Sequence, residues 1–196
     1  MRKLSLFLVG SVLFLLAGSS QAITGLGIGL RGGLVANYDN PALDVNNVDL
    51  KRMQMIGGHL KIGTLKIVDL ELSAEYAWKK KKDAFAPVVP NVDVTVGDLS
   101  VNGTVKYNFN FPVVRPFVGL GLGWHRLVYS SSGPAGSYTI PDDESTWGWQ
   151  PVGGVALHFP AVQFEIFLEG RYTSIQTSGK NTNYTSIIGG LTFNLP

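Results

Sequence analysis

Ionisable side chains recur at alternate positions in this chain, a spacing that places them on one face of a β-strand. The clearest case runs from Val68 to Lys79, where Asp69, Glu71 and Glu75 share one face. Carboxylates held close together can do acid–base chemistry or carry protons, whereas carboxylates beside lysine or arginine form ion pairs. The side chains predicted to face the same side are Arg31, His59, Lys61, Asp69, Glu71, Glu75, Asp98, Lys106, His125, His158, Glu165, Glu169 and Arg171.

Both signs of charge are similarly represented in this set, which favours a salt-bridged interior over a paired-carboxylate active site or an ion path. Counted along their strands, Arg31, Glu75 and Glu169 lie at similar heights, so we predict that they cluster and that Arg171 joins them. Glu71 and Lys106 are predicted to form a separate, lower pair. The predicted interior charge network consists of Arg31, Lys61, Glu71, Glu75, Lys106, Glu165, Glu169 and Arg171.

Metal and thiol chemistry have little support in the sequence. The chain has no cysteine, and its three histidines, His59, His125 and His158, lack the close spacing that is typical of zinc sites. The simpler interpretation is that these histidines lie in the interior or near turns, with their ring nitrogens hydrogen-bonded to neighbouring groups. We therefore predict no catalytic, cofactor-binding or metal-binding residue and no cofactor.

One run of charge stands apart from this alternation. Lys79, Lys80, Lys81 and Lys82 are consecutive and follow Trp78 directly. Clustered ammonium groups attract anionic surfaces, so these lysines are predicted to contact lipopolysaccharide; a solvated loop base is the alternative.

Eight segments alternate apolar and polar residues in this way, which indicates strands. Their ranges are 24–37, 53–65, 68–79, 94–110, 116–129, 147–159, 162–175 and 184–195. Long polar connections (38–52, 80–93, 130–146, 176–183) alternate with short ones (64–67, 111–115, 160–161), as in an up-and-down barrel. The segments are long enough to cross hydrocarbon as tilted strands, and an even number of strands closes the sheet. The predicted fold is therefore all-β, an eight-stranded antiparallel transmembrane barrel with short periplasmic turns and long extracellular loops.

Aromatic residues, which played no part in placing the strands, sort by height. Tryptophan and tyrosine fall toward the long loops and phenylalanine toward the short turns, which predicts girdles at two membrane interfaces. The predicted girdle residues are Trp78, Trp124, Trp147, Trp149, Tyr172, Phe109, Phe117, Phe159, Phe164 and Phe193.

The first residues read as an export signal. A basic Met1-Arg2-Lys3, an apolar run from Leu4 to Ala17 and the small residues of Ser20-Gln21-Ala22 predict a signal peptide over residues 1–22, cleaved to leave a barrel domain of residues 23–196. Without Arg2 and Lys3, 14 basic and 14 acidic residues remain, so no nucleic-acid partner is implied.

Three stretches resemble the OmpA- and OmpX-like small outer-membrane barrels of Gram-negative bacteria. They are the runs 115–123 (RPFVGLGLG) and 167–172 (FLEGRY), and Ile188-x-Gly190-x-x-Phe193-x-Leu195, which is similar to the terminal signal read by the barrel-assembly machinery. The chain departs from that signal by ending in Leu195-Pro196. The resemblance implies an integral outer-membrane location and contact with lipid, lipopolysaccharide and the assembly machinery.

Small barrels also include lipid A deacylases, which carry a His-x-Ser pair on a late strand. The comparable stretch here, residues 171–175 (RYTSI), has no histidine, so a serine nucleophile would lack its base and no enzyme is predicted. The leading prediction is a structural and surface-interaction protein whose loops contact a ligand or maintain the envelope. The alternatives are a narrow porin-like channel and, third, a lipid-modifying enzyme.

Overall fold

The computed structural model describes residues 25–39, 52–65, 67–82, 93–109, 111–132, 142–158, 162–178 and 180–195. The predicted signal peptide and Phe159 lie outside these ranges. No helix within them is long and apolar enough to cross a membrane. Their eight strands are β1 (Gly25–Asp39), β2 (Arg52–Leu65), β3 (Val68–Lys81), β4 (Asp93–Asn108), β5 (Val114–Ser132), β6 (Glu144–His158), β7 (Phe164–Ile175) and β8 (Thr182–Leu195).

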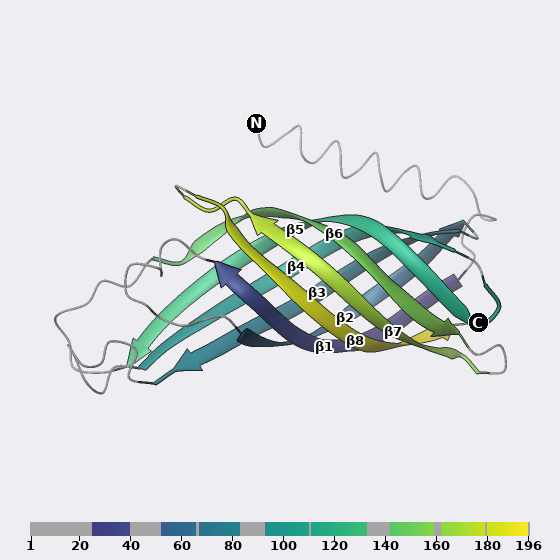
Figure 1. Cartoon of the computed structure of the whole chain (residues 1–196), viewed down its shortest axis with the longest axis horizontal. Coiled ribbons are helices and arrows are strands. Elements are labelled where there is room, and N and C mark those ends of the chain that lie inside the picture. The colour runs from purple at the N-terminus through teal and green to yellow at the C-terminus, as the bar shows by residue number, and fades with distance from the viewer. Residues whose placement is uncertain are drawn as a thin grey trace.

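Each strand pairs antiparallel with its neighbours in the chain, and β8 pairs with β1 to close the barrel. The closing ladder runs from Leu26–Leu195 to Ala36–Thr185. Figure 1 shows the strands wound at a tilt around a long cylinder, with the short connections at the right. Closure is what a sheet in hydrocarbon requires, because lipid offers no partner to an open edge. The predicted eight-stranded, antiparallel, up-and-down barrel is confirmed.

The two faces of each strand alternate as predicted. On β3, Leu72 and Tyr76 are exposed on the outer face, whereas Glu71, Ser73 and Glu75 are buried in the interior. The apolar side chains therefore cover the outside of the cylinder, and the polar side chains fill it.

The interior is not polar throughout. Toward the long connections it is filled by apolar side chains that are at most 2% exposed: Val35, Met53, Val94, Val96, Leu127 and Ile175. We call these six residues the apolar layer. β4 is longer than the roughly 9–11 residues that cross hydrocarbon. The alternation that turns Asp98 inward therefore continues to the start of the strand, where Val94 and Val96 also point inward. The interior thus combines the polar side chains expected from the sequence with an apolar layer that the sequence analysis did not predict.

Small residues on β5 make room for the long side chains of this interior. A Cβ atom at Gly119 would lie 2.5 Å from the Val105 carbonyl oxygen and 3.2 Å from Lys106 Cγ. Glycine at this position lets the Lys106 stem pass across the wall toward the centre.

Candidate functional site: the interior charge network

Six charged side chains from β1, β3, β4 and β7 form a closed ring of alternating sign, which we call the charge ring. Going round it, every neighbouring pair is in contact. The distances are Arg31 Nη2–Glu71 Oε1 2.6 Å, Glu71 Oε2–Lys106 Nζ 2.9 Å, Lys106 Nζ–Glu169 Oε2 2.6 Å, Glu169 Oε1–Arg171 Nη2 2.8 Å, Arg171 Nη1–Glu75 Oε2 2.8 Å and Glu75 Oε1–Arg31 Nη1 3.1 Å.

The charge ring is neutral and shielded from water. Its three cations balance its three carboxylates, and no ring side chain is more than 7% exposed. A buried ion left without a counter-ion costs several kcal/mol, so two partners for every member offset the loss of hydration. Ser73 donates a further hydrogen bond to Glu75, and Arg171 donates one to the side-chain oxygen of Gln150.

Two phenylalanines and a histidine pack against the charge ring. Lys106 Nζ lies 4.7 Å from the centroid of the Phe117 ring, and Arg31 Cζ lies 5.3 Å from that of Phe167. The rings of His59 and Phe167 meet edge to face with their centroids 5.3 Å apart, and His59 forms hydrogen bonds with Arg31 and Thr192. The aromatic faces add cation–π attraction to the ion pairs.

Phe117 is therefore wrongly placed among the predicted girdle residues. Odd-numbered positions of β5 point inward, and Phe117 is 4% exposed. Phenylalanine is a residue type common at membrane interfaces, which led to the girdle prediction. The odd position of Phe117 on β5 instead places its ring inside the barrel, beside Lys106. The interior roles of Phe117 and Phe167 were missed, and their parity on β5 and β7 was the signal that could have found them.

The remaining network residues lie near the short connections. Lys61 Nζ is 2.8 Å from Glu165 Oε1, and His158 Nδ1 is 3.8 Å from the other oxygen of that carboxylate. Asn108 donates a hydrogen bond of 2.8 Å to Asp69. This group is more exposed than the charge ring and lines the mouth of the cylinder.

A third polar group lies between the charge ring and the apolar layer. His125 Nδ1 is 3.1 Å from both oxygens of Asp98, and the Tyr184 hydroxyl donates to Asp98 at 3.1 Å. All three residues are buried. Among the described residues, no three acidic or histidine side chains are grouped so that they could hold a metal ion.

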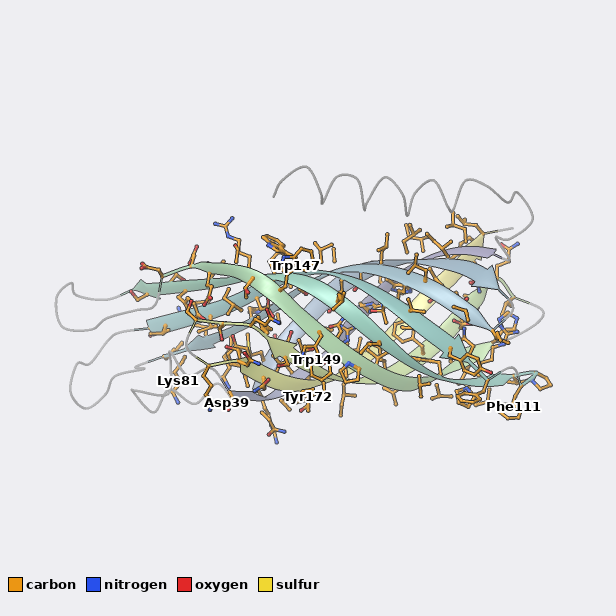
Figure 2. The ribbon with its side chains drawn as sticks, turned by 90° about the horizontal axis from the view of Figure 1, so that it is seen from above. Asp39, Lys81, Phe111, Trp147, Trp149 and Tyr172 are labelled. Atoms are coloured by element: carbon orange, nitrogen blue, oxygen red, sulfur yellow. The ribbon has the colours of Figure 1, made fainter. Side chains whose placement is uncertain are left out.

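The other predicted girdle residues within the described ranges lie on the outer wall. Trp147, Trp149, Tyr172, Phe109, Phe164 and Phe193 are exposed, and Trp78 and Trp124 are partly so. Figure 2 shows Trp147, Trp149 and Tyr172 on the wall, with Asp39 and Lys81 toward one end of the cylinder and Phe111 at the other.

The lysine run lies at the far end of β3. Lys80 Nζ is 2.9 Å from Asp93, and both Lys80 and Lys82 are exposed. Directly before the run, Trp78 stacks on Tyr76 with ring centroids 5.6 Å apart. The four ammonium groups thus follow an aromatic pair on the wall.

Residues 5–194 match the model of the outer membrane protein beta-barrel domain family, and the chain belongs to that family. It is accordingly an integral protein of the outer membrane, and the resemblance read from its sequence is confirmed. No curated protein sequence matches the chain at a significant level.

Solved structures share the fold at low sequence identity. Neisserial surface protein A is 15% identical, with 87% of this chain and 97% of that chain covered and a TM-score of 0.57. Ail of Yersinia pestis, in complex with the heparin analogue sucrose octasulfate, is 13% identical over 87% of this chain and 97% of that chain, with a TM-score of 0.55. OprG of Pseudomonas aeruginosa is 12% identical, with 88% of this chain and 97% of that chain covered and a TM-score of 0.55.

Proposed function

We propose that this outer-membrane protein has a structural and surface-interaction role, with a barrel that is closed to solutes along its axis and loops that make the contacts. The charge ring is the observation that carries the proposal. Its ion pairs join β1, β3, β4 and β7 across the interior, and the apolar layer fills the space beyond. An eight-stranded barrel is just wide enough for side chains to fill it.

Planar-bilayer recordings of the purified protein test this closure. We expect no stable, reproducible open level, because an ion would have to displace paired charges and then pass apolar side chains. Discrete open levels in the wild-type protein would instead support the narrow-channel alternative.

We further propose that the protein is not an enzyme and that its lysine run contacts phosphate groups of lipopolysaccharide. Residues 171–175, on β7, offer no histidine to activate a serine or threonine. Lys79–Lys82 follow the Tyr76–Trp78 stack at the end of β3, where the membrane interface meets the loops. The complex of Ail with a sulfated heparin analogue is consistent with a polyanion binding to a barrel of this fold.

Replacing Lys79, Lys80, Lys81 and Lys82 together by glutamine should weaken binding to vesicles that contain lipopolysaccharide. The deficit should shrink as salt is raised, because the contact is made between exposed charges. Co-sedimentation with the vesicles measures it. Lys180→Gln is the control, since it removes an exposed lysine that lies outside the run. Equal binding by the fourfold variant and the wild type would overturn the assignment.

A further inference from the structure

The outer wall is hollowed where β2 and β3 run side by side. Gly58 and Ala74 pair across these strands, and neither has a side chain that reaches out over the wall. A Cβ atom at Gly58 would meet nothing closer than a carbonyl oxygen at 3.5 Å. The hollow is a groove of about 600 Å³, a volume typical of small-ligand sites. We call it the wall groove, and the large side chains around it are Ile28, Leu30, Leu60, Leu72 and Val101.

The wall groove lies at the depth of lipid acyl chains. Gly58 is six positions from Arg52 along β2, and Ala74 is six positions from Lys80 along β3. Six residues span about 20 Å along a strand, or about 15 Å along the axis of a barrel with tilted strands. This depth is about half the thickness of the hydrocarbon core. With Arg52 and Lys80 at the interface, the groove faces the far ends of the acyl chains, so its occupant is apolar.

Cations stand at the ends of the same two strands. Arg52 and Lys80 each lie two residues beyond the last pair of the β2–β3 ladder, on the outer face. Both are exposed, as is Lys82. Lys80 Nζ is 2.9 Å from Asp93, whereas the Arg52 side chain forms no hydrogen bond or ion pair within the described ranges. A guanidinium group that faces the interface in this way can hold a phosphate with two parallel hydrogen bonds.

The wall between these cations and the groove is open along β2. On β3, Tyr76 leans toward β4, because a Cβ atom at Gly97 would lie 2.8 Å from the Tyr76 hydroxyl oxygen. Trp78 stacks on Tyr76. The two rings therefore lie toward β4 and leave the outer face of β2 to Ile56 and Gln54. An acyl chain can follow β2 beside this aromatic stack.

We propose that this face of the barrel binds one acylated, phosphorylated glycolipid, with a phosphate on Arg52 and Lys80 and one acyl chain in the wall groove. The site extends the proposed lysine contact with lipopolysaccharide, on which it rests, by Arg52 and by a seat for the chain. Among the described residues at these strand ends, Arg52, Lys80 and Lys82 outnumber the carboxylate of Asp93, which favours an anionic head group.

Tethering explains why this chain, and not any passing lipid, fills the groove. A phosphate held at the interface keeps its own acyl chain close to the hollow, so the chain is ordered at a lower entropic cost than that of a free lipid. In hydrocarbon the gain comes from packing, because a chain in the groove restores the dispersion contacts that an unfilled hollow lacks.

Filling the groove tests the seat without touching a charge. Gly58→Leu fills it from β2. Ala74→Leu fills it from β3, at a position that already has a Cβ atom. Gly170→Leu is the matched control, because Gly170 also lies on the outer face in the middle of a strand, β7, with open space in front of it.

Native mass spectrometry of the detergent-solubilised protein, titrated with lipid A, counts bound molecules and gives the dissociation constant of the first. Gly58→Leu and Ala74→Leu should bind lipid A about fivefold more weakly than the wild type, through lost packing. Gly170→Leu should bind it as the wild type does. Arg52→Gln should weaken binding both of lipid A and of its deacylated, bisphosphorylated disaccharide, whereas the groove variants should bind the disaccharide normally.

Unchanged affinity of both groove variants for lipid A would overturn the acyl seat, and so would an equal loss in Gly170→Leu. Phosphatidylcholine that binds as tightly as lipid A would show that any lipid fills the groove, which also overturns the proposal. The fourfold glutamine variant of Lys79–Lys82 keeps the two proposals apart. If it binds the disaccharide as tightly as the wild type does, the proposed lysine contact itself fails.

Discussion

Replacing Glu169 by leucine should lower the free energy of unfolding by about 3–5 kcal/mol, because two buried cations then lose a counter-ion. Glu169 binds Lys106 at 2.6 Å and Arg171 at 2.8 Å, and its side chain is fully buried. Leucine fills much of the same volume, so the loss should come from charge and not from a cavity. Urea titration of the protein folded in lipid vesicles measures it.

The double variant Glu169→Leu/Lys106→Met is the control. It removes one charge of each sign and leaves Arg31, Arg171, Glu71 and Glu75 joined as two cations and two anions. We expect it to recover most of the stability lost by Glu169→Leu. If the single variant were as stable as the wild type, the charge ring would not be the buried, balanced network described above.

On the outer wall, Leu72→Arg should cost about 2–4 kcal/mol, the penalty for a lipid-facing arginine near the bilayer midplane. Leu72 lies near the middle of β3 and is 45% exposed on the face that carries Tyr76. The same vesicle-based unfolding titration measures the change.

Depth provides the control for that prediction. Val114 is also exposed on the outer face but lies at the start of β5, beside the short β4–β5 connection. Val114→Arg should cost only about 0–1 kcal/mol, since the penalty falls toward the interfaces. If Leu72→Arg and Val114→Arg lowered the free energy of unfolding equally, Leu72 would not lie deeper in the hydrocarbon than Val114, which would contradict this account.

Strand phase could be predicted from the sequence because hydrocarbon outside and ions inside impose a strict period of two. Alternation predicts that the odd positions from Asp69 to Glu75 point inward, and Glu71, Ser73 and Glu75 are buried in the interior. Phe117 shows where residue type misleads: phenylalanine resembles an interface anchor, yet an inward phenylalanine is stable when a lysine lies over its ring.

Which charged side chains pair within the charge ring could not be predicted from the sequence. Positions counted along the strands predict that Glu71 and Lys106 form a pair separate from the cluster, whereas both belong to the charge ring. They also predict that Arg31 lies beside Glu169, but these two residues do not form an ion pair among the described residues. Lys106 stands opposite Asp69 in the ladder but reaches Glu71 and Glu169 instead. Alternate residues are about 7 Å apart along a strand, so a long side chain such as Lys106 can contact residues one or two positions above or below its own height. The sequence does not show in which direction along the barrel axis it extends.

Single spin labels along β3, in a chain with no native cysteine, test most directly whether lipid covers the outside of a closed, water-poor barrel. In vesicles, labels at Leu70, Leu72, Ala74 and Tyr76 should be relaxed by oxygen, which concentrates in hydrocarbon. Labels at Glu71, Ser73 and Glu75 should be reached poorly by both oxygen and a water-soluble nickel chelate. Strong relaxation of the odd-numbered labels by the nickel chelate would reveal an aqueous lumen and contradict this account.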